Sequence, residues 1–469
     1  MAVDAAVCAE LTYGRWVGTP PACWRGATLD SRKIRPGQLF VAMRGAQRDG
    51  HEFLGEVWER GAAAALVEKA DPKLALPQLE VENVGRALQT LGRAWRRAFS
   101  GPVIALTGSC GKTTTKNLLA RLLAGNGENI HATEGNYNNL LGVPLTLLGL
   151  DPEKHDKAVI ETGINQPGEM LLLARMIEPT EVILTSVEPV HLERLETLDN
   201  IAREKLFLGH QGGGAVLLTA PENVAEYVAV QTYPGEVFLV GTGEQSKAPF
   251  LWKWNRTTEG KRFLAWEDRR PGLAERGEMP LPRVSRGMVA NIALALAVAR
   301  RHGVSGEACR ERLKGWEPEG MRGEIRSFGG RCIYLDCYNA NPAAMIDALE
   351  FFQCDLAAGP EARLYIMGTM GELGAQSADW HKRAMAAVEI RAGDQYRLIG
   401  EEGEVMREAL MGRGVEQAAC QVVAEAGDLR REVGNFSGPV FLKGSRRYRL
   451  EEALPQEEKV KALEEGLAC

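Results

Sequence analysis

The sequence lacks the features that mark membrane, secreted and metal-cluster proteins. No apolar run approaches the ~18 residues that a membrane-spanning helix needs, and the start, MAVDAAVCAE, has neither the basic stretch nor the apolar core of a secretory signal. The nine cysteines are an odd number and form neither a CxxC pair nor a Cys/His ligand spacing. They indicate reduced thiols in a cytoplasmic protein rather than a disulfide framework.

The chain also lacks a strong net charge. Lys and Arg together number 56 and Asp and Glu together 62, so the formal charge is −6, and this mild acidity argues against nucleic acid as the main partner. The composition, 45% hydrophobic and 25% charged, is typical of globular proteins. At 469 residues the chain is longer than one hydrophobic core supports, so we expect two or three domains.

One missing glycine distinguishes an otherwise familiar loop. The common phosphate-binding loop reads G-x-x-x-x-G-K-[ST], but Leu106 stands where its first glycine would be. The sequence TGSCGKTT has only two residues between Gly108 and Gly111. It follows the apolar run 103–106 and precedes the helix-like segment 113–124, which is the strand–loop–helix order that a phosphate site requires.

We therefore expect this loop to bind ATP, and the alternative interpretation is a glycine-rich turn with a surface lysine. Lys112 would bring a positive charge to the outer phosphates, and the hydroxyl of Thr113 or Thr114 would bind Mg²⁺. The expected ATP-binding residues of the loop are Thr107, Gly108, Ser109, Cys110, Gly111, Lys112, Thr113 and Thr114.

Apolar runs and helical patterns divide the chain into three α/β regions. Residues 1–98 form a small α/β pattern, 99–316 begin at the phosphate loop, and 317–469 alternate strands with helices. Such alternation predicts mainly parallel sheets, in a central mononucleotide-binding domain of the P-loop type and a Rossmann-like C-terminal domain. A stretch rich in Trp and Arg, 251–283, interrupts the central region, and we interpret it as an antiparallel excursion.

Ligands of parallel sheets bind at the carboxyl ends of the strands, and three candidates follow strands of the central region. Glu161 ends the run KAVIE, where a carboxylate is well placed to hold Mg²⁺ on a nucleotide; the alternative is a solvated glutamate. His191 follows the next strand, although a lone histidine is more often structural than a ligand. Lys205, taken alone, is an ordinary lysine on a solvated helix face.

Polar motifs follow other strands. The loop TEGNYNN, 133–139, offers amide donors and acceptors. The tract DCYNANP leaves a strand and enters a helix at its proline, which makes Asp336 and Asn339 ligand candidates and Asn341 a helix N-cap. The turn KGSR, 443–446, is basic and suits an anionic substrate group.

In combination these motifs resemble the Mur ligases, and the resemblance covers essentially the whole chain. The short phosphate loop and the Asn-rich loop before Gly-Val-Pro resemble those of the family, and DSR, 30–32, resembles part of its UDP-sugar-binding domain. The tract D-x-Y-N-A-N-P, with M-x-E-L-G at 370–374 and K-G-S-R, is similar to the member that adds D-Ala-D-Ala to UDP-MurNAc-tripeptide. The D-Y-A-H and D-N-P-R motifs of the member that adds the third residue are not found in the sequence.

The resemblance implies an ATP-dependent amide-bond ligase that works through an acyl phosphate in cytoplasmic peptidoglycan precursor synthesis. It implies a monomer with no nucleic-acid or membrane partner, and it leaves open whether the tripeptide ends in diaminopimelate or lysine. By similarity, two Mg²⁺ are bound by Thr113, Glu161, His191 and Lys205, the last as a CO₂-derived carbamate.

The resemblance also assigns further residues. The expected catalytic residues are Lys112, Lys205, His191 and Arg322. Asn291 is expected near the adenine, and Arg322 and Asp336 at the ATP phosphate and ribose. The expected substrate-binding residues are Ser31, Arg32, Asn136, Asn138, Asn139, Tyr338, Asn339, Asn341, Lys443, Ser445 and Arg446.

Three positions depart from the family pattern. Gly287 stands where the family usually has His, Thr369 where Asp is usual, and Leu206-Phe207 where Gly-Glu usually follows the lysine. Two alternatives remain: a folylpolyglutamate-synthase-like ligase of the same superfamily, and a non-catalytic ATP-binding paralogue, which the departures at Gly287 and Thr369 alone favour. The first is disfavoured because about 100 residues with a DSR motif precede the phosphate loop.

Overall fold

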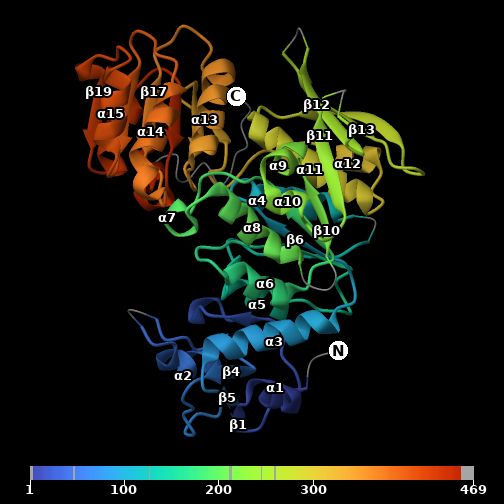
Figure 1. Cartoon of the computed structure of the whole chain (residues 1–469). Coiled ribbons are helices and arrows are strands. Elements are labelled where there is room, and N and C mark those ends of the chain that lie inside the picture. The colour runs from blue at the N-terminus through green and yellow to red at the C-terminus, as the bar shows by residue number, and fades with distance from the viewer. Residues whose placement is uncertain are drawn as a thin grey trace.

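The computed structural model describes residues 4–455 except 46–47, 126, 211–213, 244–245 and 258–259. It has three α/β domains, each built on its own sheet (Figure 1). This architecture confirms the predicted fold class, although the predicted end of the third domain, 456–469, lies outside the described residues. None of the helices in the described part of the chain combines the length and the apolar character needed to cross a membrane.

Within the described residues, the N-terminal domain has a five-stranded sheet in the order β1-β5-β4-β3-β2. Its strands are β1 (Arg15–Val17), β2 (Ala27–Thr28), β3 (Leu39–Val41), β4 (Ala64–Val67) and β5 (Gln78–Glu80), and its helices are α1 (Ala5–Thr12), α2 (Leu54–Glu59) and α3 (Val84–Ala98). Only β1 is antiparallel to its neighbour. Side chains of β3 and β4 divide between two hydrophobic clusters, one on each face, so both strands are buried.

Helix α3 joins this domain to the next. Asn83 caps its start by accepting a hydrogen bond from the backbone of Arg86 at 2.8 Å. Near its C-terminal end, α3 contacts the end of α6 (Glu169–Ile177). There the buried Arg96 donates to the carbonyl oxygens of Ile177 and Glu178. The N-terminal and central domains are therefore joined through a buried, hydrogen-bonded contact.

The central domain has nine strands among the described residues, in the order β14-β13-β12-β11-β10-β9-β6-β8-β7. Strands β6 to β12 pair in parallel with their neighbours, whereas β12, β13 and β14 pair antiparallel with one another. This confirms the predicted antiparallel excursion over 251–283, except at residues 258–259, which lie outside the described residues. The strands are β6 (Val103–Thr107), β7 (Ile130–Ala132), β8 (Lys157–Glu161), β9 (Glu181–Leu184), β10 (Val216–Thr219), β11 (Val237–Thr242), β12 (Phe250–Arg256), β13 (Arg262–Asp268) and β14 (Glu275–Leu281).

Helices cover both faces of this sheet. One face packs against α4 (Lys112–Leu123), α11 (Arg286–Arg301) and α12 (Gly306–Leu313), and the other against α5 (Gly142–Leu148), α6 and α8 (Leu198–Leu206). The short helices α7 (Leu192–Leu195), α9 (Pro221–Glu226) and α10 (Val228–Gln231) follow the strands. With both faces covered, the parallel strands expose only their ends, and the carboxyl ends of β6, β8 and β9 lie side by side.

The C-terminal domain has six strands in the described range, in the order β15-β16-β20-β17-β18-β19, parallel except for β15. The strands are β15 (Glu324–Phe328), β16 (Arg331–Asp336), β17 (Leu364–Gly368), β18 (Gln395–Ile399), β19 (Cys420–Val423) and β20 (Val440–Lys443). The helices are α13 (Pro342–Phe351), α14 (Ser377–Ala386), α15 (Gly403–Met411) and α16 (Arg430–Asn435). Two hydrophobic clusters cover its faces, so this sheet also presents its carboxyl edge.

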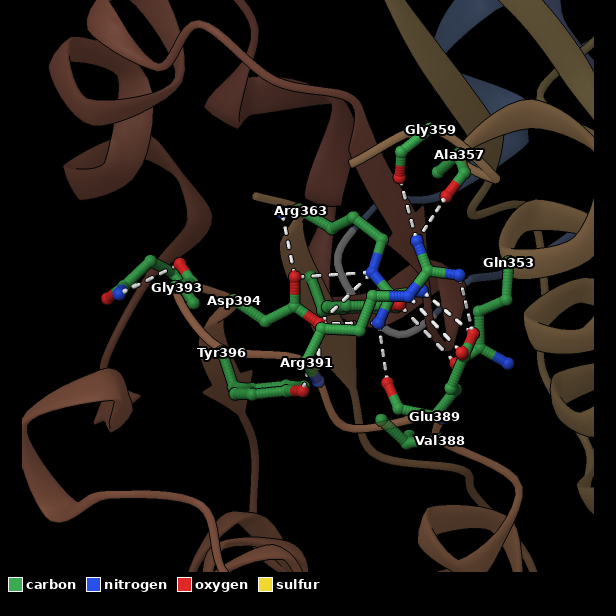
Figure 2. A network of polar contacts seen from close by, with 12 residues as sticks. Gln353, Ala357, Gly359, Arg363, Val388, Glu389, Arg391, Gly393, Asp394 and Tyr396 are labelled. Carbon is green, nitrogen blue, oxygen red and sulfur yellow. Dashed lines mark hydrogen bonds and ion pairs between the residues drawn. The ribbon is translucent and has the colours of Figure 1, made fainter. Parts of the chain in front are cut away.

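A buried ion-pair network holds the amino ends of β17 and β18 together (Figure 2). Arg363 and Asp394 are both fully buried, and the guanidinium donates to the carboxylate through Nε at 3.0 Å and Nη2 at 2.5 Å. Glu389, which is half exposed, accepts a further hydrogen bond from Arg363 at 3.2 Å. The network lies at the strand ends opposite the candidate site, so its role is structural.

Candidate active site

The phosphate loop is a tight connection that only glycine fits at two positions. Strand β6 ends at Thr107 and α4 begins at Lys112. Gly108 and Gly111 have φ of +146° and +83°, which L side chains rarely adopt. A Cβ at Gly108 would collide with the Thr185 hydroxyl, and one at Gly111 with the Asn291 side chain. The two glycines therefore bring the loop against its neighbours.

The residues after β9 hold the loop from beside it. The Ser109 N–H donates to the Ser186 carbonyl at 2.9 Å, its hydroxyl donates to the Glu188 carbonyl at 3.0 Å, and the Cys110 N–H donates to the Ser186 hydroxyl at 3.1 Å. No side chain in the described chain caps the start of α4. The first N–H groups of α4 and its positive dipole end are thus available to an anion.

Two lysine amines meet at one carbonyl oxygen below the loop. Lys112 donates to the Gly108 carbonyl at 2.7 Å, and Lys205 of α8 donates to the same oxygen at 3.2 Å. Lys205 is only 2% exposed, and its burial, together with the charge of Lys112, holds its pKa well below the usual range. Burial likewise lowers the pKa of Lys112. Lys205 thus does not lie on a solvated helix face.

Glu161 is a buried carboxylate with one oxygen to spare. Its Oε1 accepts hydrogen bonds from the Thr113 hydroxyl at 3.1 Å and the Asn138 amide at 2.8 Å. Its Oε2 has no hydrogen-bond partner among the described residues, and the nearest cation is Lys116 Nζ at 4.0 Å. A buried acceptor without a donor is rare in proteins and is open to a cation. The donor set of Glu161 and Thr113 therefore fits Mg²⁺.

Among the described residues, His191 shares no hydrogen bond with Glu161. Its Nδ1 contacts Glu372 of the C-terminal domain, and its backbone has a positive φ of +55°. The described residues contain no group of three or more His, Cys, Asp and Glu side chains that could hold a metal ion. The expected ligand set of Thr113, Glu161, His191 and Lys205 mixes other residue types, and it stays a prediction.

A cleft of about 600 Å³ separates the carboxyl edges of the central and C-terminal sheets. Sixteen of the predicted site residues line it: Ser109, Cys110, Gly111, Lys112, Thr113, Thr114, Asn136, Asn138, Glu161, Asn291, Arg322, Asp336, Tyr338, Asn339, Asn341 and Lys443. The remaining predicted residues lie outside its lining: Ser31, Arg32, Thr107, Gly108, Asn139, His191, Lys205, Ser445 and Arg446. The structure thus brings both walls of the predicted ATP site together.

The C-terminal wall of the cleft begins where β16 ends. Asp336 accepts a hydrogen bond from Lys443, at the end of the neighbouring strand β20, with Oδ2 and Nζ 2.5 Å apart. The Arg322 guanidinium lies over the Tyr338 ring, 3.6 Å from its centroid. Asn341 caps α13 by accepting a hydrogen bond from the Ala344 N–H at 2.8 Å, which confirms its predicted N-cap role.

Several other predicted substrate residues have local partners. Asn139 Oδ1 accepts from the backbone of Gly142 at 2.8 Å, and Arg446 pairs with Glu451 at 2.5 Å. In the N-terminal domain, the exposed Arg32 donates to Asp30 at 2.8 Å, and this hydrogen bond lowers the pKa of Asp30 to about 2.

The departures from the family pattern have local structural reasons. The Gly287 N–H donates to Asp347 of α13 at 3.0 Å, and a Cβ at position 287 would lie 2.7 Å from that carboxylate. Thr369 is fully buried, and its hydroxyl lies 2.6 Å from that of Tyr448. Leu206 belongs to the buried core of the central domain. The first departure thus makes room for a side chain from the C-terminal domain.

Sequence reasoning missed four side chains at or near this site. Lys116 lies four residues after Lys112 on α4, so helical spacing could have indicated it. Asp347 lines the cleft from α13, where nothing in the sequence distinguishes it from a surface residue. Glu188 also lines the cleft, and burial raises its pKa to about 7, helped by the charge of Glu226. Glu372 was noted within M-x-E-L-G without a role.

Comparison with known proteins identifies the family. Residues 25–96 match the catalytic domain of the Mur ligase family, 106–299 the Mur ligase middle domain, and 321–445 the Mur ligase glutamate ligase domain. A UDP-N-acetylmuramoyl-tripeptide–D-alanyl-D-alanine ligase of Escherichia coli is 30% identical, over 94% of each chain. The chain belongs to the Mur ligase family. It is therefore an ATP-dependent ligase.

Two further Mur ligases are similar over most of the chain. The ligase of the same name from Bacillus subtilis is 29% identical over 91% of this chain and 92% of its own. The solved structure of a MurF ligase from Thermotoga maritima in complex with ADP has a TM-score of 0.75 and 26% identity, and covers 92% of this chain and 96% of that one. The three-domain α/β fold is thus shared along nearly the whole length.

Proposed function

We propose that this enzyme joins D-alanyl-D-alanine to UDP-N-acetylmuramoyl-tripeptide, with ATP as the energy source, in cytoplasmic peptidoglycan precursor synthesis. The observation that carries the proposal is the cleft in which the phosphate loop faces the tract 336–342 of the C-terminal domain. The names of the Escherichia coli and Bacillus subtilis relatives support the choice of substrates. A cleft built by one chain supports a monomer as the active unit.

The reaction begins with the terminal carboxylate of the tripeptide. It attacks the γ-phosphorus of ATP, the bond to the β-phosphate oxygen breaks, and an acyl phosphate and ADP result. The neutral amine of D-Ala-D-Ala then attacks the acyl carbon, and inorganic phosphate leaves with the electron pair of the broken C–O bond. The proton that the nitrogen loses passes to the phosphate or to solvent. Positioning and positive charge supply most of the catalysis, because the first step brings two anions together.

The residues of the cleft supply that charge and positioning. The first N–H groups of α4 and the Lys112 ammonium bind the phosphates from one wall. The Arg322 guanidinium, stacked on Tyr338, approaches the same cleft from the other wall. Asn291, beside Gly111, binds on the base side of the phosphates. Closure of the C-terminal domain over the cleft would exclude water that hydrolyses the acyl phosphate.

Magnesium and a lysine carbamate complete the proposal. The second oxygen of Glu161 and the Thr113 hydroxyl would hold Mg²⁺, with His191 as a further ligand. When bound, the cation would neutralise negative charge on the phosphates. Lys205 is buried beside a second lysine, which favours its neutral amine. Because only a neutral amine adds to CO₂, this setting supports carbamate formation on Lys205.

The N-terminal domain would bind the UDP-sugar through Ser31 and Arg32. Arg32 is exposed and its partner Asp30 lies on the same turn, so a UDP phosphate can compete for the guanidinium. The C-terminal residues Tyr338, Asn339 and Lys443 would bind the dipeptide, and Ser445 and Arg446 flank them beyond the cleft.

The direct test is ADP release by purified enzyme supplied with UDP-MurNAc-tripeptide and ATP. We expect release to depend on D-Ala-D-Ala, with the diaminopimelate and lysine tripeptides compared side by side. Release that ignores the dipeptide would contradict the proposal. Turnover with folate and glutamate instead would favour the folylpolyglutamate-type alternative, and no turnover with either set would favour a non-catalytic paralogue.

A further inference from the structure

A histidine–carboxylate contact is one of several that join the central and C-terminal domains. His191 lies in the central domain, immediately before α7, and Glu372 lies in the C-terminal domain between β17 and α14. The Nδ1 atom of His191 contacts Oε2 of Glu372. Figure 1 shows α7 directly against the C-terminal domain, below α14.

The backbone is unusual on both sides of this contact. His191 and Glu372 have φ of +55° and +62°, in the left-handed region that residues other than glycine rarely adopt. Such conformations cost free energy and persist only where surrounding structure enforces them. The Glu193 N–H donates to the Glu372 carbonyl at 3.4 Å, so the two backbones also meet directly. Both residues of the contact thus lie on strained backbone.

The loop that carries Glu372 is anchored on its own domain. His381 of α14 is fully buried, and its Nε2 accepts a hydrogen bond from the Met370 N–H at 2.8 Å while its Nδ1 donates to the Ser377 carbonyl at 2.8 Å. Leu373, next to Glu372, is 2% exposed and packs in the domain core. Glu372 is therefore fixed to the C-terminal sheet, and its position reports where that domain sits.

The contact determines which nitrogen of His191 is free. A carboxylate accepts the hydrogen bond, so Nδ1 carries a proton, and in the neutral imidazole Nε2 then keeps the lone pair. Carboxylates that hold a histidine in this way fix its ring orientation and its tautomer, and their loss typically costs 10–100-fold in activity or metal affinity. Arg194 and Arg447 contribute positive charge on this carboxylate, one from each domain.

We propose that Glu372 is a positioning residue that orients the His191 imidazole only when the C-terminal domain is seated on the central domain. It thereby couples seating of the dipeptide-binding domain to assembly of the phosphate-transfer site. The expected effect on turnover rests on the proposed function, because His191 is an expected Mg²⁺ ligand of that reaction. The orientation of the ring can be tested without turnover.

The test compares Glu372→Ala with Glu372→Gln, whose amide oxygen can still accept from Nδ1. The matched control is Glu401→Gln, an 81%-exposed carboxylate near the same end of the C-terminal sheet that contacts Arg447 of its own domain. The first readout is the His191 tautomer, from two-bond ¹H–¹⁵N correlation spectra of the full-length protein, with the resonance assigned by His191→Gln. The second is ADP release, separated into kcat and KM.

We expect the Nδ1–H tautomer in the wild type, in Glu372→Gln and in the control, and a mixture of tautomers in Glu372→Ala. We expect kcat to fall 10–100-fold in Glu372→Ala with a smaller change in KM for ATP, and to recover partly in Glu372→Gln. An unchanged tautomer in Glu372→Ala would overturn the proposal. A fall in kcat in Glu401→Gln as large as that in Glu372→Ala would also overturn it. If the wild type shows no dipeptide-dependent turnover but the tautomer shifts as expected, the orientation holds and the proposed function fails.

Discussion

Replacing Asp394 by alanine should destabilise the C-terminal domain strongly. Asp394 and Arg363 are both fully buried, and the carboxylate accepts hydrogen bonds from the Arg363 backbone at 2.9 Å, from Nε at 3.0 Å and from Nη2 at 2.5 Å. After the substitution, the only hydrogen-bond acceptors left to the guanidinium among the described residues are the half-exposed carboxylate and the carbonyl oxygen of Glu389 (Figure 2). Removing one partner of a buried pair leaves an uncompensated charge and costs about 3–5 kcal/mol.

The loss should appear as a lower melting temperature of one domain. For a unit of about 150 residues, each kcal/mol lowers Tm by roughly 2–4 °C, so we expect a fall of roughly 10 °C in scanning calorimetry of the full chain. The control is Glu404→Ala, which removes an exposed pair with Arg407 in the same domain and should cost less than about 1 kcal/mol. Because the network lies at the opposite strand ends from the cleft, kcat at 25 °C should stay within about twofold. A Tm equal to that of the control would refute the reasoning.

Two further outcomes are expected. Burial holds the pKa of His131 at about 4, below its ordinary 6.5, so on acidification the unfolded state takes up the proton first. About 3 kcal/mol of stability, present above pH 6.5, is therefore lost as the pH falls to 4. His131→Gln should flatten the dependence of the urea-unfolding free energy on pH over that range, and an unchanged slope would contradict this. Lys205→Ala should abolish turnover, with partial rescue by a short added carboxylic acid, and a normal rate in the variant would exclude the carbamate.

The strands and helices that the sequence predicted are those with strong apolar patterns. The run KAVIE became β8, and the apolar run 103–106 and the helix-like segment 113–124 became β6 and α4 at nearly the expected bounds. Short or edge strands such as β1, β2 and β7 were missed, because two or three residues carry no periodicity and their pairing depends on distant partners.

The site was predictable where chemistry and chain order coincide. Lys112 lies in the turn after β6 and Glu161 ends β8, and these two parallel strands are neighbours in the sheet. Lys205 was unremarkable in the sequence because its burial beneath Gly108 depends on how α8 packs. Asp347 and Glu372 could not be predicted, since their contacts with Gly287 and His191 arise only when one domain docks on another.

The central claim, that one cleft performs phosphate transfer and amide formation in sequence, is tested most directly by product stoichiometry. Purified enzyme would be incubated with ATP, UDP-MurNAc-tripeptide and D-Ala-D-Ala, and both ADP and UDP-MurNAc-pentapeptide measured by mass spectrometry. The account predicts one ADP for each pentapeptide formed, and no pentapeptide when any substrate is left out. ADP release without pentapeptide in the complete mixture would contradict it.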